Sequence, residues 1–261
     1  MIKILEDYFL RKRVESLGTE WKSQINTSSI FKNVKNVVVL LNDDLKEFED
    51  FLTFDKSLKD RLDNPNIFYF CSSYFTLYKD LFKGNFEEIK KPKPLKFSEL
   101  DHIFDFLKKV KKIDLYFDLS SFEKFDRKLL IRTFKPSVSI TFFEEKLEED
   151  FNILFKSDDR RILNILKLLN FEILSEDFSP FLKDRIKQLN ITVYPIVLIG
   201  TSSKILNEKK RIEKEGRKFL YIKNFKDDLN IVNLYHILHT KEIFFDDKLL
   251  TEINFLKKFK V

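Results

Sequence analysis

The sequence contains few of the residues on which several familiar kinds of site depend. Its 261 residues include four glycines, one cysteine, one tryptophan and no alanine. Loops that hold phosphate groups usually rely on glycine, because glycine lets the backbone turn tightly and approach the ligand. The scarcity of glycine therefore argues against a P-loop NTPase and against an enzyme with the GxGxxG fingerprint.

Cysteine and histidine are too scarce for several kinds of cross-link and metal site. The single cysteine, Cys71, excludes a disulfide framework and a metal site built on cysteines. It follows the apolar run 67–70, so we expect a buried structural thiol and not a nucleophile. His236 and His239 lie three residues apart, but without a third ligand they suit surface or half-buried positions better than a zinc site. We expect no metal and no cofactor.

Long hydrophobic runs are also absent. No stretch approaches the roughly 18 uncharged apolar residues of a membrane span, and acidic residues stand too early at the N-terminus for a signal peptide. We therefore expect a cytoplasmic protein. The first residues predict an amphipathic helix that ends at Gly18, with these apolar residues near one side: Ile4, Leu5, Tyr8, Phe9 and Val14. Peripheral contact with the inner face of a membrane is expected through its cations Arg11, Lys12 and Arg13.

The charge of the chain is mildly basic. Lysine and arginine number 48 against 42 acidic residues, which gives a formal net charge of +6. A basic balance favours polyanionic partners. The charges are interspersed, however, as in residues 208–214, and this pattern is typical of a solvated helix face. We expect the charge to serve solubility, and nucleic-acid binding is the lesser alternative.

Patterns typical of strands alternate with patterns typical of helices along the sequence. Short runs of β-branched and aromatic residues predict strands at 37–41, 67–70, 113–117, 138–142, 151–155, 193–199, 219–222 and 242–245. Apolar residues at helical spacing predict helices at 45–62, 100–110 and 162–169. The continuous apolar runs suit strands buried on both faces of a parallel sheet. The alternation predicts an α/β protein.

The predicted strands fall into two unequal groups. Five precede residues 157–192 and three follow them, and two predicted helices at 158–170 and 180–189 separate the groups. We predict two unequal Rossmann-like halves with mostly parallel sheets. The expected domains are an N-terminal helix and linker at 1–30, a first Rossmann-like domain at 31–172 and a smaller second one at 173–261.

Ligand-binding loops in such folds follow the carboxyl ends of the strands. Asp43 and Asp44 follow the first predicted strand, where either would act as a general base. The alternative is that they cap the next helix. Residues 200–204, Gly-Thr-Ser-Ser-Lys, follow the sixth strand. Backbone N–H groups at a helix start, hydroxyls and a lysine suit a diphosphate. Asp118 opens a further loop, after the third strand.

The order of these pieces resembles glycosyltransferase family 9, the heptosyltransferase-like enzymes with the GT-B fold. Residues 112–119, KIDLYFDL, resemble the family's "yDlvidl" strand, and residues 195–200, PIVLIG, resemble its "pvvllGg" strand. The other segments that carry the resemblance are 34–44, 54–82, 127–140 and 228–247. The resemblance implies a GT-B-like fold, a nucleotide-diphosphate sugar as donor, and a cell-envelope saccharide or lipid as acceptor.

The resemblance also implies roles for single residues. Asp43 or Asp44 would be the catalytic base, and Asp247 stands in the turn that helps to bind the diphosphate. The remaining phosphate contacts would be Gly200, Thr201, Ser202 and Lys204. The family's Gly-Asp turn is Asn42-Asp43 here, and residues 247–251 lack the glycine and histidine of its final turn. The alternative is therefore a non-catalytic relative whose Rossmann-like halves serve as an interaction scaffold.

Overall fold

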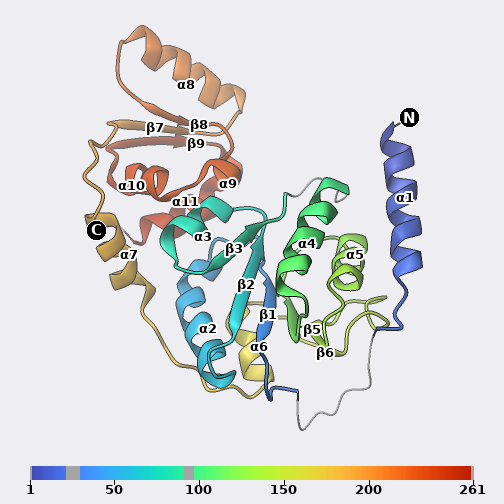
Figure 1. Ribbon diagram of the computed structural model, residues 1–261. Coiled ribbons are helices and arrows are strands. Elements are labelled where there is room, and N and C mark those ends of the chain that lie inside the picture. The colour runs from blue at the N-terminus through green and yellow to red at the C-terminus, as the bar shows by residue number, and fades with distance from the viewer. Residues whose placement is uncertain (1, 22–29, 91–96, 260–261) are drawn as a thin grey trace. The chain divides into compact units, whose positions relative to one another are not determined.

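The computed structural model of the chain describes residues 2–21, 30–90 and 97–259 (Figure 1). The chain forms two compact units. Unit 1 consists of Met1–Asp43, Asp50–Ser72 and Gly84–Glu176. Unit 2 consists of Asp44–Glu49, Ser73–Lys83 and Asp177–Val261. The domain limits at residues 30 and 172 remain predictions from the sequence.

Unit 1 contains a six-stranded parallel sheet in the order β3-β2-β1-β4-β5-β6. Its strands are β1 (Asn36–Leu40), β2 (Asn66–Cys71), β3 (Asn85–Glu88), β4 (Leu115–Asp118), β5 (Val138–Phe142) and β6 (Ile153–Phe155). Val37 pairs with Ile67 of β2 and Leu115 of β4, so β1 is hydrogen-bonded on both sides. The chain adds strands outward from β1 in one direction and from β4 in the other. The winding therefore reverses between β1 and β4.

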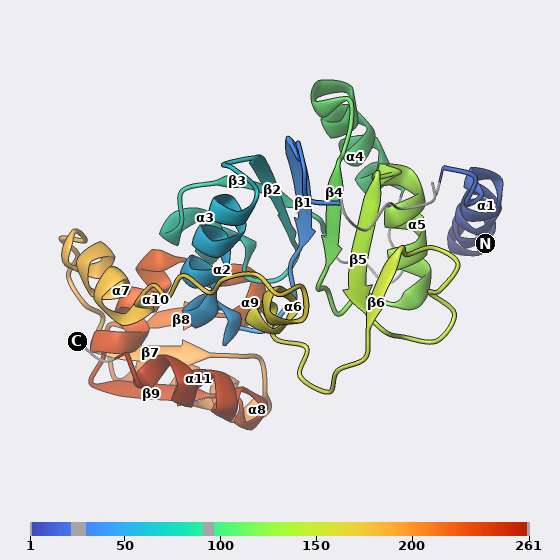
Figure 2. The same ribbon diagram turned by 90° about the horizontal axis from the view of Figure 1, so that it is seen from below.

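Helices cover both faces of this sheet. They are α1 (Ile2–Leu17), α2 (Glu47–Arg61, whose first residues belong to unit 2), α4 (Phe97–Val110), α5 (Lys124–Phe134) and α6 (Ile162–Leu168). Figures 1 and 2 show α1, α4 and α5 on one face and α2 and α6 on the other. Phenylalanine fills much of the core: the ring of Phe70 lies 5.0 Å from that of Phe106 and 5.2 Å from that of Phe134.

The first helix packs on α5 through a different face from the one predicted. Leu10 and Val14, one helical turn apart, are buried, whereas Tyr8 and Phe9 are 54% and 55% exposed. The predicted grouping of Tyr8 and Phe9 with Val14 is therefore wrong, because the buried stripe of α1 follows the spacing of four residues. The predicted helix end is confirmed, since Gly18 adopts a left-handed conformation with φ +56°.

Unit 2 contains a three-stranded parallel sheet in the order β8-β7-β9. Its strands are β7 (Ile196–Ile199), β8 (Leu220–Ile222) and β9 (Glu242–Phe245). Its helices are α3 (Phe75–Leu81), α7 (Phe178–Lys187), α8 (Ser203–Lys214), α9 (Phe225–Asp228), α10 (Ile231–His239), the 3₁₀ turn η2 (Asp247–Leu249) and α11 (Leu250–Lys257). Figure 1 shows α8 on one face of the sheet and α10 on the other. The winding reverses between β7 and β9.

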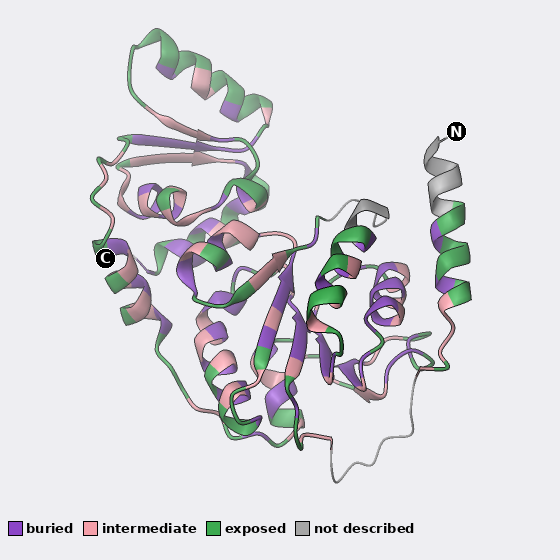
Figure 3. Cartoon of the chain, viewed as in Figure 1, coloured by how far each residue is buried: buried purple, intermediate pink, exposed green. Residues whose placement is uncertain are grey.

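The predicted α/β class with mostly parallel sheets is confirmed, since every strand pair of both sheets is parallel. Figure 3 shows the central strands as the most deeply buried elements and α8 as largely exposed. Several elements escaped prediction, among them the edge strand β3 and the short helices α3 and α9. Within the described residues, no helix combines the length and the apolar character needed to cross a lipid bilayer.

Candidate functional site in unit 2

A pocket of about 270 Å³ lies at the carboxyl edge of the sheet in unit 2. The loops that follow β7, β8 and β9 form its wall. Its lining residues are Gly200, Thr201, Lys223, Asn224, Phe225, Lys226, Asp246, Lys248, Leu249 and Glu252. It adjoins the point at which the winding of the sheet reverses, where ligands bind in open α/β sheets.

A buried carboxylate, Asp246, bridges β9 and β7 at this edge. Its Oδ2 accepts a hydrogen bond from the backbone N–H of Thr201 at 3.0 Å, and its Oδ1 accepts one from the N–H of Ser202 at 3.2 Å. Gly200 has φ +117°, and a Cβ atom there would overlap the Asp246 carboxylate. A glycine is therefore required at this position for two reasons, backbone conformation and space.

The surroundings of Asp246 favour its charged form. Burial opposes ionisation, but hydrogen bonds from the Ser202 hydroxyl and from the N–H groups of Thr201 and Ser202 outweigh burial, so the pKa of Asp246 lies below its usual value. Asp246 thus places a negative charge at the N-terminus of α8, where the helix dipole stabilises it. The two backbone donors that the sequence offers to a phosphate are bonded to this carboxylate.

The residues predicted from the sequence for a phosphate site lie in two different surroundings. Gly200 and Thr201 line the pocket. Ser202 caps α8, since its Oγ accepts a hydrogen bond from the N–H of Ile205 at 3.4 Å. Lys204 and Asp247 form an ion pair of 3.2 Å outside the pocket lining, with side chains 64% and 91% exposed.

Three lysines that sequence reasoning missed line the pocket instead. Lys223 follows β8, Lys226 lies in α9, and Lys248 lies in η2 after β9. Lys226 also lies 5.8 Å from the ring centre of Tyr74. None of the three lysines is ion-paired with another described residue. The signal available in the sequence is their position within four residues of a strand end, the region in which ligand loops occur.

The predicted catalytic carboxylates have different local partners. Asp43 follows β1 in unit 1, and its Oδ1 accepts a hydrogen bond from the Ser72 hydroxyl at 2.6 Å, at the end of β2. Asp44 accepts a hydrogen bond from the N–H of Lys46 at 3.0 Å, and its carbonyl accepts one from Glu47 at 3.1 Å. The bonds of Asp44 are those of a residue that begins a helix. The roles of both carboxylates as bases stay predictions.

A buried network of charges occupies the carboxyl end of β4 in unit 1. Asp118 accepts a hydrogen bond from Arg127 Nε at 2.9 Å, and Arg127 Nη1 donates to Glu144 at 2.6 Å. Arg127 also donates to the hydroxyl of Thr141, which in turn donates to the carbonyl of Asp118. Burial lowers the pKa of Arg127, but the charges of Asp118 and Glu144 raise it by a larger amount, so the pKa lies above its usual value. The network neutralises Asp118.

Neither the cysteine nor the histidine pair belongs to a metal-binding cluster among the described residues. Cys71 is 1% exposed, and burial raises the pKa of its thiol, with further increases from Asp43 and Glu88. This confirms the predicted buried thiol. His236 is buried, and its Nδ1 accepts a hydrogen bond from the N–H of Tyr194 at 3.3 Å. Among the described residues, no group of three or more metal-binding side chains occurs.

Two solved structures resemble this chain in fold. One is the glycosyl transferase family 9 protein from Veillonella parvula, with 10% identity, a TM-score of 0.48, and coverage of 85% of this chain and 78% of that chain. The other is the E. coli heptosyltransferase WaaC with ADP-2-deoxy-2-fluoro heptose, with 7% identity, a TM-score of 0.48, and coverage of 85% and 86%. The likeness is one of fold. No model of a known protein family matches the sequence, and no curated protein matches it.

Proposed function

We propose that the chain is a glycosyltransferase-like protein whose unit 2 binds a nucleotide-diphosphate sugar. The observation that carries this proposal is the lysine-lined pocket at the carboxyl edge of the β8-β7-β9 sheet. Parallel α/β sheets bind nucleotides at this edge, and lysine is a common phosphate ligand. The sugar would pass to a saccharide or lipid of the cell envelope, as the sequence resemblance implies.

The diphosphate would be bound by side chains and not by a glycine-rich loop. Lys223, Lys226 and Lys248 supply three positive charges, against the two negative charges of Asp246 and Glu252. Asp246 is already bonded to the loop after β7, so the lysines remain the available partners for added negative charge. A pocket of about 270 Å³ suits one polar part of such a donor better than the whole molecule.

Asp43 is the proposed base of the transfer. It follows β1 at the reversal of winding in unit 1, and the Ser72 hydroxyl fixes one oxygen of its carboxylate at 2.6 Å. A base in this reaction removes the proton from the acceptor hydroxyl as the hydroxyl oxygen bonds to the anomeric carbon, whose bond to the diphosphate breaks so that the nucleoside diphosphate leaves. Asp44 is the weaker candidate, because its Oδ1 accepts from the backbone at the start of α2.

A non-catalytic scaffold is the second candidate function. The observation that favours it is the occupation of the Thr201 and Ser202 N–H groups by Asp246, which withdraws the two backbone donors nearest the pocket from any phosphate. In that case the pocket lysines would serve solubility alone, and unit 2 would bind no nucleotide.

Thermal unfolding with a panel of nucleotides and nucleotide sugars separates the two candidates. A ligand at about 100 times its Kd stabilises the folded chain by about 2.7 kcal/mol. We expect a rise in the unfolding midpoint with a nucleoside diphosphate or its sugar, and a loss of that rise in the K223A/K226A/K248A variant. No rise with any nucleotide at millimolar concentration would leave the scaffold as the function.

The matched control removes the same number of lysines from α8 and the loop that follows it. Lys210, Lys214 and Lys218 are exposed and do not line the pocket. The K210A/K214A/K218A variant should keep the full ligand-induced rise, measured against its own midpoint without ligand. Lys204→Ala tests the loop predicted from the sequence. A smaller ligand-induced rise of the midpoint in this variant, together with a full rise in K223A/K226A/K248A, would place the diphosphate at the loop and not at the pocket lysines.

A further inference from the structure

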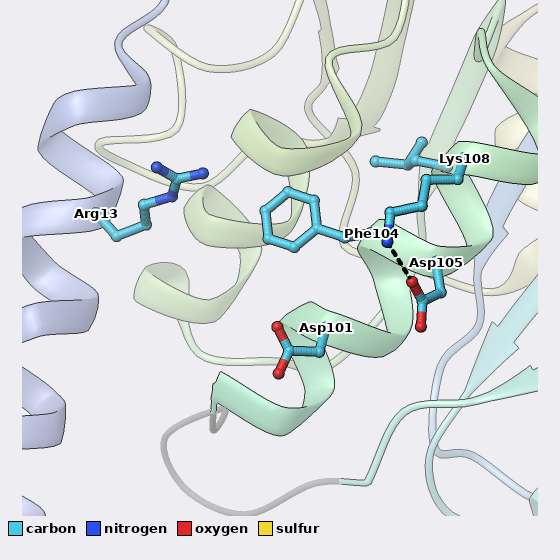
Figure 4. A pocket seen from close by; sticks show the side chains of 6 residues that line it. Arg13, Asp101, Phe104, Asp105 and Lys108 are labelled. Carbon is cyan, nitrogen blue, oxygen red and sulfur yellow. Dashed lines mark hydrogen bonds and ion pairs between the residues drawn. The ribbon is translucent and has the colours of Figure 1, made fainter.

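The groove of about 780 Å³ between α1 and α4 in unit 1 has balanced charges (Figure 4). Its charged lining residues are two cations, Arg13 and Lys108, and two carboxylates, Asp101 and Asp105. Asp105 forms an ion pair of 2.7 Å with Lys108, and the guanidinium carbon of Arg13 lies 5.8 Å from the centre of the Phe104 ring. The pocket of unit 2 instead has three lysines against two carboxylates, so an added anion is favoured there.

One of the three pocket lysines, Lys226, is held differently from the other two. Lys226 is half-buried, whereas Lys223 and Lys248 are exposed. The Nζ of Lys226 lies 5.8 Å from the centre of the Tyr74 ring, and no aromatic ring of the described residues lies under the ammonium of Lys223 or Lys248. A ring face attracts a cation more strongly when the cation is partly withdrawn from water. Tyr74 therefore restricts the ammonium of Lys226.

The backbone of Tyr74 has a conformation that large side chains rarely adopt. Tyr74 precedes α3 in unit 2 and has φ 61° and ψ 11°, in the left-handed region. The residue is 2% exposed. Residues in this conformation persist only where the surrounding structure fixes them, and they cluster at functional sites. The partners of Tyr74 therefore bear on its role.

Two of these partners are residues of α9 that line the pocket. The N–H of Tyr74 donates a hydrogen bond to the carbonyl of Lys226 at 3.1 Å. The Tyr74 ring is in edge-to-face contact with that of Phe225, with centroids 6.3 Å apart. One tyrosine thus contacts both the backbone and the ammonium of the same lysine. Tyr74 is not among the residues that line the pocket, so it acts on the pocket through Lys226 and Phe225.

We propose that Tyr74 is a positioning residue of the phosphate site, which holds the ammonium of Lys226 for one phosphate group of the donor. This role rests on the proposed binding of a nucleotide-diphosphate sugar by unit 2. A lysine side chain loses rotamer freedom when it binds an anion, and a lysine that is already held loses less. The ring attracts the ammonium through its face, so the N–H groups that point away from the ring stay available for phosphate oxygens.

Calorimetric titration of the full chain with ADP, GDP, CDP and UDP, each alone, tests this role. Tyr74→Leu removes the ring, and we expect it to raise the Kd of the bound nucleotide about two- to fivefold, the size of one cation–π contact. Tyr74→Phe keeps the ring and should bind as the unchanged chain does. In a Lys226→Ala background, Tyr74→Leu should have no further effect on the Kd. An equal loss in both backgrounds would show a merely structural role and overturn the proposal.

Graded fluorination of the ring gives a second arm that preserves the size of the side chain. Phenylalanine at position 74 would be compared with its 4-fluoro, 3,5-difluoro and 3,4,5-trifluoro derivatives, because each fluorine weakens the negative face of the ring. We expect the Kd to rise with each fluorine that is added. A Kd that stays constant across the series, in a chain that binds nucleotide, would contradict the proposed role.

Phe178→Leu is the matched control, because it also removes a buried ring from unit 2. The ring partners of Phe178 are Phe82, Phe181 and Phe259, which lie outside the pocket lining. This variant should lower the unfolding midpoint and leave the Kd unchanged. A chain that binds none of the four nucleotides would refute the proposed function and the role of Tyr74 together, whereas binding that Tyr74→Leu leaves unchanged would refute the role of Tyr74 alone.

Discussion

The two sheets place a buried carboxylate at the same topological position and stabilise its charge in different ways. Asp118 ends β4 beside β1, and Asp246 directly follows β9 beside β7. In both units the winding reverses between these two strands. Asp118 is bonded to Arg127, which is itself buried. Asp246 is bonded to backbone N–H groups and a hydroxyl, and the pocket lysines form no ion pair within the part of the chain that the structure describes.

This difference bears on which charges remain available at each edge. The buried ion pair of unit 1 joins Asp118 to Arg127, so neither of these two side chains is left for a ligand. Backbone donors hold a carboxylate without adding a cation, so the cations around it remain available. The partner of the buried carboxylate at each reversal point thus affects which cations there can meet a ligand.

The largest expected effect comes from breaking the buried ion pair. Arg127→Met would leave the Asp118 carboxylate buried without its cation, and we expect a loss of about 3–5 kcal/mol in the free energy of unfolding, measured in urea. Arg217→Met, which removes ion pairs on the surface of unit 2, is the control and should barely move the midpoint. Equal losses in the two variants would contradict the assignment of a structural role to the network.

Gly200→Ala should have the next largest effect. The backbone there has φ +117°, and the added Cβ would overlap the Asp246 carboxylate, so we expect a loss of about 2–3 kcal/mol. In an Asp246→Ala background the same change should cost less, because the overlap is gone. Gly216→Ala has φ +66° and open space around the added atom, so it should cost only about 1 kcal/mol.

Asp246→Asn should show how unit 2 depends on pH in acid. The folded pKa of Asp246 lies below the unfolded value of about 3.9. Its ionisation therefore stabilises the fold above that pH, and this stabilisation is lost as the pH falls through the folded pKa. We expect Asp246→Asn to cost about 1–2 kcal/mol at neutral pH and to flatten the acid limb of the unfolding curve. Asp247→Asn, at an exposed neighbour, should leave that limb unchanged.

His236 predicts a smaller effect, confined to unit 2. Burial lowers the pKa of His236, and the neighbouring His239 lowers it further. The unfolded chain therefore binds a proton more readily, so stability is complete above about pH 6.5 and declines as the pH falls below it. We expect His236→Phe to lose less stability on acidification to pH 5.5 than the unchanged chain does. The difference in the free energy of unfolding should be less than about 1 kcal/mol.

The buried strands were predictable because their burial leaves a pattern in the sequence. Residues 37–40 of β1 have neighbours on both sides and helices on both faces, so nearly all of them are apolar. The edge strand β3 has the sequence Asn-Phe-Glu-Glu and is only partly buried, so it lacks any such run. The helix α1 was predicted with the wrong grouping of side chains, because two aromatic residues that are exposed were placed on the same side as the buried Val14.

The candidate site was less predictable than the fold. The loop after β7 was recognised from its glycine and hydroxyls, but the partner of its N–H groups is Asp246, forty-four or more residues away along the chain. Asp246 and Asp247 are adjacent in sequence, and the structure buries the first and exposes the second. The pocket lysines resemble the many other lysines of the chain, and only the convergence of three strand ends distinguishes them.

Because Gly200 lies so close to Asp246, the residues that are acceptable at these two positions, which are far apart in the sequence, depend on one another. Loss of the carboxylate at position 246 would remove the steric overlap at position 200 and free the N–H groups of Thr201 and Ser202, but the φ of +117° would still favour glycine there. We therefore expect a substitution at position 246 to lower the cost of a later substitution at position 200, although each has a cost of its own.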